Sequence, residues 1–181
     1  MEHYDYAAAK AEVGLLFWQD LADNYLEMAK GRLYADNLED ASGARVTLTT
    51  ALRTVLKLLA PFLPYVTEEI WQHLFVPSPW QTSLHRTTWP AIDPIWDNAE
   101  AAALGEMLVG IATAVRRYKS ERAMSLGAEI EGLILAPADP TCAAWLAAAE
   151  PDLQSVTRAK SIEITGECGG GETILHTERL V

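Results

Sequence analysis

Hydrophobic positions recur every three to four residues through the first part of the chain, which is the pattern of helices with one buried face. The first such stretch, residues 4–34, contains no proline and predicts one long helix or a kinked pair. We expect its apolar face to pack in a core, with Trp18 and Tyr25 on the same side because they stand seven residues apart. That face consists of Leu15, Trp18, Ala22, Tyr25, Ala29 and Leu33.

Three more helices are predicted downstream. Ser42 or Gly43 is expected to cap the second helix, and Pro61 to end it, because a proline disfavours helical geometry in the residue before it. Pro64 suits the first turn of the third helix, and the fourth should run from about Asp97 to Ser120. The expected buried positions are Leu48, Leu52, Val55, Leu56 and Leu59, then Ile70, Trp71 and Leu74, then Leu104, Leu108, Ile111 and Val115. Four such helices indicate a bundle.

Two segments break this helical pattern. Residues 76–94 are crowded with Pro, Ser and Thr and predict a long loop, and loops of that length usually have a function. Beyond residue 124, alternating or continuously apolar runs predict a strand, a helix and two further strands, with a hairpin turn in GECGGGE. The expected fold is therefore mainly α: a helical bundle in residues 1–123, followed by a small α+β appendage in residues 124–181.

Composition restricts where the protein acts. Charged residues interrupt every apolar run before the roughly 20 residues needed to cross a bilayer, so no membrane partner is expected. Glu2 and Asp5 are unlike the basic start of a secretory signal, which favours a cytoplasmic location. Cys142 and Cys168 lie far apart without a CxxC pair, so neither a disulfide framework nor a zinc site is predicted. We expect a monomer.

The distribution of charge bears on nucleic-acid binding more than the net charge of −11 does. Residues 1–40 hold nine acidic and three basic side chains, and residues 123–181 hold the same numbers. Residues 41–122, by contrast, hold seven acidic and eight basic side chains, so a polyanion is tolerated best there. Within that segment a small basic patch consists of Arg116, Arg117, Lys119 and Arg122.

Catalytic chemistry finds little support in the sequence. No Walker loop, GxGxxG or GxSxG motif occurs, so no nucleotide or acyl-transfer site is predicted. Glu69 and His73 stand one helical turn apart, but carboxylate metal sites in bundles need a matching pair on other helices. His85 beside Arg86 lacks a recognisable nucleophile and an orienting carboxylate. We therefore expect no catalytic residue and no metal ligand in this chain.

Polar residues on a second face of the first helix could contact RNA. Asn24, Glu27, Lys30 and Tyr34 lie away from the predicted core face. Asn and Lys can hydrogen-bond to the edges of bases, and Tyr can stack on a base. An ordinary solvated helix face would have the same composition, and a run such as RRYKSER is often only surface. Both alternatives remain open from these residues alone.

Four segments in order together resemble a known family: FWQDLADNYLEMAKGRLY, APFLPYVTEEIWQHL, SLHRTTWP and YKSERAMSLGAEI. They resemble the region that follows the catalytic domain in class I aminoacyl-tRNA synthetases, and in particular the valyl-tRNA synthetases. APFLPYVTEEIW is shared with isoleucyl and leucyl enzymes, so it marks the anticodon-binding bundle only. DNYLE with KGRLY, and the Lys-Ser-Glu run, point toward valine.

The resemblance implies a bundle that receives the anticodon stem and loop of a valine tRNA. Candidate contacts are Asn24, Glu27, Lys30, Arg32 and Tyr34 for bases, and Arg116, Arg117, Lys119 and Arg122 for phosphates. The HIGH and KMSKS motifs of amino-acid activation are missing, so this chain alone is expected neither to form an adenylate nor to charge tRNA. ATP would bind an absent catalytic domain, and no cofactor is expected here. The other implied partners are the catalytic and editing domains of the same enzyme.

Three alternatives remain. The same module of an isoleucyl-tRNA synthetase would bind a different tRNA. A helical protein-interaction domain would use its acidic ends and ignore RNA, and its partner binding would be insensitive to salt. An enzyme would need a cofactor site that the sequence does not reveal.

Overall fold

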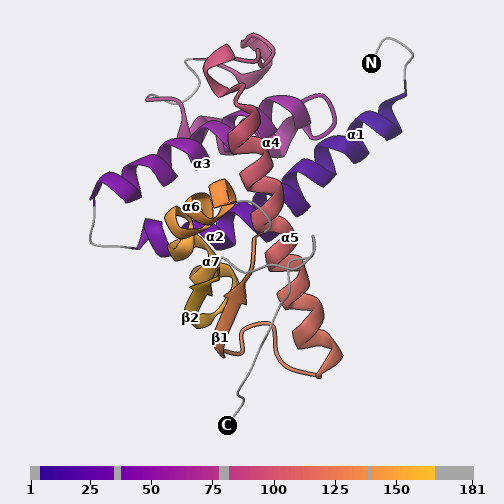
Figure 1. Ribbon diagram of the computed structural model, residues 1–181. Helices are drawn as coiled ribbons and strands as arrows, with labels where there is room; N and C mark the ends of the chain where they lie inside the picture. The colour runs from indigo at the N-terminus through magenta and orange to yellow at the C-terminus, as the bar shows by residue number, and fades with distance from the viewer. Residues whose placement is uncertain (1–4, 35–37, 78–81, 138–139, 166–181) are drawn as a thin grey trace. The chain divides into compact units, whose positions relative to one another are not determined.

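The computed structural model describes residues 5–34, 38–77, 82–137 and 140–165 (Figure 1). Most of these residues are helical, and two strands form a small parallel sheet, which confirms the predicted fold class. The chain forms two compact units: unit 1 comprises Met1–Tyr25 and Ser42–Trp96, and unit 2 comprises Leu26–Ala41 and Asp97–Val181. The predicted hairpin turn and last strand, and Cys168 with them, lie outside the described residues.

The predicted first helix is confirmed as three consecutive segments, α1 (Tyr6–Leu15), η1 (Leu16–Tyr25) and α2 (Leu26–Leu33). The middle segment is a π-helix, whose turns are wider than those of an α-helix. In this segment Trp18 is 64% exposed and Asn24 only 7% exposed. The prediction that Trp18 packs in the core is therefore wrong, and Leu15, on the same predicted face just before the π-helix, is also exposed, at 47%.

The second helix, α3 (Leu38–Leu59), begins earlier than predicted. Ser42 and Gly43 lie inside it and cap nothing, so that prediction is wrong. Ala41 and Ala44 are buried and extend the apolar stripe toward the N-terminus, which explains why the helix starts before the polar residues end. Pro61 follows the end of α3, as predicted.

The third helix, α4 (Pro64–Leu74), has its proline in the first turn, as predicted. Trp71 is buried, and it forms the core of unit 1 with Leu56, Ala60 and Leu84. Leu74, the last residue of α4, was expected to be buried but is 60% exposed.

The predicted loop after α4 contains two short 3₁₀ segments, η2 (Leu84–Arg86) and η3 (Pro94–Trp96). Glu68 of α4 holds the first one: its carboxylate accepts hydrogen bonds from Ser83 Oγ and from the Leu84 amide, both at 2.9 Å. The side chains of Trp71 and Gln72 also donate to the carbonyl oxygen of Thr82. The loop is thus fixed to α4, and Glu68, Trp71 and Gln72 of the APFLPYVTEEIWQHL segment have a structural role.

The ionisation of Glu68 follows from these contacts. Burial alone would raise the pKa of its carboxyl group, but four nearby groups more than offset this effect and hold the pKa below 4.5. They are the side chains of Gln72 and Ser83, the backbone amide of Leu84, and His85. Because the hydrogen bonds favour the charged form, the folded state binds this proton more weakly than the unfolded state does.

Glu68→Gln is expected to reduce the free energy of unfolding by about 1–2 kcal/mol at pH 7, because charge-assisted hydrogen bonds are lost. A carboxyl group whose pKa is lowered on folding contributes stability above its unfolded pKa and loses it as the pH falls through the folded value. The gap between wild type and variant should therefore close below pH 4.5. Urea unfolding at pH 7 and between pH 5 and 3 measures it, with the exposed neighbour Glu69→Gln as control; a gap that does not narrow as the pH falls from 5 to 3 would contradict the prediction.

Unit 2 contains the fourth helix, α5 (Ala99–Glu121), close to the predicted range. Asn98 caps it by accepting a hydrogen bond from the Ala101 amide at 3.0 Å. Leu108, Ile111 and Val115 are buried, which confirms the predicted stripe.

The rest of unit 2 is β1 (Ile130–Leu135), α6 (Pro140–Ala148), α7 (Glu150–Thr157) and β2 (Ala159–Ile164). The predicted single helix between the strands is two helices, because Pro151 has no amide hydrogen to continue the first one and suits the first turn of the second. The strands pair in parallel, with Ile130 beside Ala159 and Leu135 beside Ile164. Parallel strands need such a crossover connection.

A single apolar core joins α2, α5 and this β-α-β element. Met28 from α2 meets residues of α5, β1, α6 and α7 in it, and Leu133 and Leu153 are completely buried. The shared core thus groups α2 and α5 with the two strands. The predicted boundary between residues 123 and 124 stays a prediction. None of the helices in the described ranges is long and apolar enough to span a membrane.

Candidate nucleic-acid interface

The candidate base-reading residues do not share one face. Asn24 is buried, and its side-chain amide donates to the carbonyl oxygen of Gln19 at 2.8 Å. Its burial in the π-helix counts against the prediction that it offers an amide to a base, which stays a prediction. Glu27 and Lys30, on α2, form an ion pair at the surface of unit 2, with about 40% of each side chain exposed. Tyr34, directly after α2, is 85% exposed and can present its ring to a base.

Arg32 has a structural partner. Its guanidinium donates two hydrogen bonds to the carboxylate of Asp152 on α7, at 2.8 and 2.9 Å. This paired geometry is the strong form of the arginine–carboxylate interaction. Nearby, Ser155 Oγ donates to the carbonyl oxygen of Glu27 at 2.7 Å. Arg32 therefore holds α2 to α7. Its expected contact with tRNA stays a prediction, and its pairing with Asp152 counts against that contact.

The basic patch at the end of α5 divides into exposed and buried members. Arg117 is exposed and lies 3.9 Å from Glu121 on the same helix. Arg122 caps the helix, and its guanidinium carbon lies 3.8 Å from the ring centre of Tyr118. Arg116 is partly buried. Arg117 and Arg122 can meet a phosphate without rearranging the core.

Lys119 cannot serve as the predicted phosphate contact, because its side chain is 1% exposed. Its ammonium donates to three backbone carbonyl oxygens, those of Leu126, Ala128 and Thr157, and these use all three of its donors. Burial, together with the nearby positive charge of Arg158, lowers the pKa of Lys119. The residue ties the end of α5 to the following turn and to the end of α7.

A signal in the sequence does identify Lys119 as an inward residue. It stands four positions after Val115 and so continues the buried stripe of α5 through Leu108, Ile111 and Val115. The dense cluster of basic residues around it favoured a surface interpretation instead. A lysine on an apolar stripe can be buried when backbone carbonyl groups satisfy it.

The accessible candidates are thus Lys30 and Tyr34 around the end of α2, and Arg117 and Arg122 at the end of α5, all in unit 2. Together they offer an aromatic ring for stacking and cations for phosphates, which is the chemistry of single-stranded RNA binding. Glu69 and His73 bond to each other on the exposed side of α4, at 2.9 Å. Among the residues that the structure describes, no three potential metal ligands gather.

Comparison with known sequences identifies the class of protein. Residues 1–134 match the family model described as the anticodon-binding domain of tRNA ligase. This match covers unit 1 and unit 2 as far as β1. The chain therefore belongs to the family of tRNA-ligase anticodon-binding domains.

The chain is similar to valine–tRNA ligases of several archaea. The protein from Methanopyrus kandleri is 43% identical over 150 residues, which are 81% of this chain and 16% of the relative. Those from Methanosarcina barkeri and Pyrococcus furiosus are 36% and 31% identical over 90% and 91% of the chain, and 18% of each relative. The chain thus spans less than a fifth of the length of the curated relatives that it matches.

Proposed function

We propose that this chain is the module of a valine–tRNA ligase that binds the anticodon stem and loop of valine tRNA. The observation that carries the proposal is the match of residues 1–134 to the anticodon-binding family, together with the similarity to valine–tRNA ligases over most of the chain. The module selects tRNA by binding and makes no bond itself. Amino-acid activation with ATP, and any editing, belong to other domains of the parent ligase, which are its partners.

The accessible residues of unit 2 support a division of labour. Tyr34 provides a ring on which an unstacked base can lie, and Lys30 can turn from Glu27 toward a base edge or phosphate. Arg117 and Arg122 provide positive charge at the end of α5, where contacts to phosphates position the RNA without reading it. Lys119 and Arg32 act within the protein, by holding α5 and α2 to α7.

A titration with three RNAs at several salt concentrations tests the proposal. The RNAs are valine tRNA, the same tRNA with an exchanged anticodon, and isoleucine tRNA. We expect binding of valine tRNA to weaken as salt rises, because cations on the RNA are released on binding. The exchanged anticodon should cost about 1–3 kcal/mol, as lost base contacts do. Filter binding or fluorescence anisotropy measures both effects.

Each of the other possible results would indicate a different function for the chain. Preference for isoleucine tRNA would assign the module to an isoleucyl enzyme. Equal binding of all three RNAs would show that the chain contacts only the backbone of the RNA. A chain that binds none of them at low salt, but binds a protein partner without regard to salt, would be an interaction domain.

A further inference from the structure

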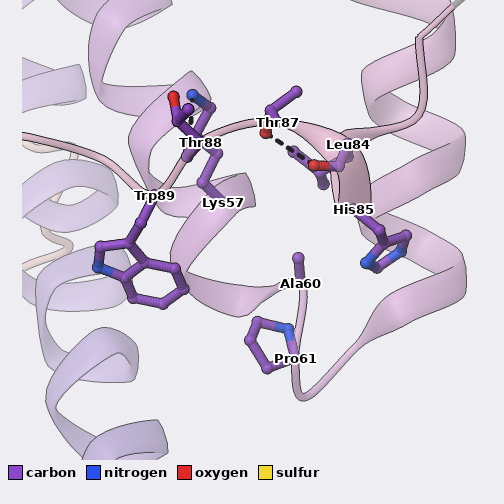
Figure 2. A pocket seen from close by; sticks show the side chains of 8 residues that line it. All are labelled: Lys57, Ala60, Pro61, Leu84, His85, Thr87, Thr88 and Trp89. Atoms are coloured by element: carbon purple, nitrogen blue, oxygen red, sulfur yellow. Dashed lines mark hydrogen bonds between the residues drawn. The ribbon is translucent and has the colours of Figure 1, made fainter.

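A pocket of about 180 Å³ lies in unit 1 between the end of α3 and the loop that carries η2 (Figure 2). Lys57, Ala60 and Pro61 contribute one wall, and residues 84, 85 and 87–89 the other. In Figure 2 the indole of Trp89 and the imidazole of His85 flank the pocket on opposite sides. The loop half of this pocket is the SLHRTTWP segment, which the proposed contacts on α2 and α5 leave without a role.

The pocket is a built feature of the fold. Glu68 fixes η2 through Ser83 and the Leu84 amide, and Leu84 is buried in the core of unit 1. On the opposite wall, Lys57 Nζ donates to the carbonyl oxygen of Thr88 at 3.1 Å. Both ends of the segment that precedes Trp89 are therefore tied to helices, and the ring extends from a fixed backbone.

The chemistry of the lining favours a nucleotide. Trp89 is 56% exposed, which leaves one large aromatic surface open to a flat ligand. Lys57 spends one of its three ammonium donors on Thr88, and none of the eight lining residues is acidic. Two further basic side chains on the same elements are exposed, Arg53 on α3 and Arg86 on η2.

The size of the pocket sets the size of the group that it can hold. Sites for drug-sized molecules enclose about 300–1,000 Å³, so a volume of about 180 Å³ suits one planar ring system. A second, wider hollow adjoins it: His85 lines both, and the other one includes Tyr65, which is 90% exposed, and Glu68, whose carboxylate accepts hydrogen bonds from Ser83 and Leu84. A strand that leaves the first pocket therefore meets another exposed ring.

We propose that this pocket receives one unstacked base of the bound tRNA, which stacks on the Trp89 indole while the Lys57 ammonium contacts an adjoining phosphate. The inference rests on the proposed function, since it names a further contact for the same RNA. Stacking of bases on aromatic side chains is tolerant of sequence, so the pocket strengthens binding more than it reads the anticodon. Specificity then stays with other residues.

Titration of the 181-residue chain and its variants with valine tRNA tests the pocket. Trp89→Leu should weaken binding roughly 5- to 150-fold, the loss expected for one stacked base. Trp89→Phe keeps an aromatic surface and should retain most of the affinity. Trp96→Leu is the matched control: it is similarly exposed in the same loop but outside the lining, and it should change binding less than about twofold. Lys57→Gln should reduce the slope of the logarithm of affinity against the logarithm of salt concentration by about 1, the change expected for one lost phosphate contact.

A second readout places the RNA directly. A valine tRNA transcript that contains 4-thiouridine is crosslinked to the wild-type chain, and mass spectrometry identifies the modified peptide. We expect crosslinks in residues 84–89. Circular dichroism and thermal unfolding confirm that each variant is folded.

The outcomes separate this inference from the function on which it rests. If valine tRNA binds and the exchanged anticodon weakens it, while Trp89→Leu binds like wild type, the function stands and the pocket inference is wrong. Equal losses for Trp89→Leu and Trp96→Leu, or for Trp89→Leu and Trp89→Phe, would also overturn stacking in the pocket. A wild-type chain that binds no tRNA overturns both.

Discussion

Replacing Lys119 with methionine is expected to lower the free energy of unfolding by about 3 kcal/mol. The ammonium group satisfies three backbone carbonyl groups at once, and methionine fills a similar volume but donates nothing. A buried acceptor left without a donor costs about 1–3 kcal/mol, and partial relaxation of the turn after α5 should recover some of the sum. The loss exceeds that of ordinary surface substitutions, which stay within about 0.5 kcal/mol.

Urea unfolding of Lys119→Met measures this change, and Arg117→Met provides the control on the same helix. Arg117 is exposed, so its replacement should leave stability unchanged and weaken tRNA binding instead. Lys119→Met should therefore lower stability, whereas Arg117→Met, only two residues away, should weaken tRNA binding. A Lys119→Met protein with wild-type stability and weakened tRNA binding would restore the original assignment of Lys119 to a phosphate.

The second large effect concerns Arg32. Arg32→Met should lower the free energy of unfolding by about 2 kcal/mol, because it removes two charge-assisted hydrogen bonds and leaves the largely buried carboxylate of Asp152 without them. Lys30→Met is the matched control on α2, since its ion pair with Glu27 is at the surface, where such pairs contribute about 0–1 kcal/mol.

A double-mutant cycle tests whether the effect belongs to the pair. Asp152→Asn and the double variant are unfolded alongside Arg32→Met, and we expect a coupling energy of about 1–3 kcal/mol. Additive effects would show that Arg32 stabilises the protein by other means. Loss of tRNA binding in Arg32→Met without loss of stability would show that it contacts RNA.

Much of the fold was predictable because hydrophobic spacing and proline are local signals. The stripe of α5, the end of α3 before Pro61 and the proline at the start of α4 all follow directly from neighbouring residues. The start of α3 was missed because alanines at 41 and 44 carry a weak apolar signal, which polar neighbours obscured. The apolar stripe of α3 continues to its N-terminal part only if alanines are included among the buried positions.

Hydrophobic periodicity does not predict a π-helix, because the expected spacing assumes 3.6 residues per turn. Within it Trp18 is exposed and Asn24 is buried, the reverse of what that spacing predicts. An ideal α-helix places Asn24 on the same face as Tyr34, whereas Asn24 is buried in the structure. Tyr34 lies beyond the π-turns and keeps its predicted exposure.

The charged candidates show a second limit. A guanidinium or an ammonium has the same sequence signature whether it meets a phosphate, an aspartate or a set of carbonyl groups. Arg32 finds Asp152 at a separation of 120 residues, which no local pattern reveals. The pocket beside Trp89 likewise depends on Glu68 and on the carbonyl groups of the loop, which meet only in the folded chain.

The long separation between α2 and α7 constrains how the protein can be made. At about 5–20 residues per second, the ribosome delivers Asp152 roughly 6–24 s after Arg32. The core of unit 1, confined to residues 56–84, can form during that interval, whereas Met28 must wait for Leu153. A gene trimmed at residue 134, where the family match ends, would never supply α7. Nascent α2 would then keep its apolar side without the partner that buries it.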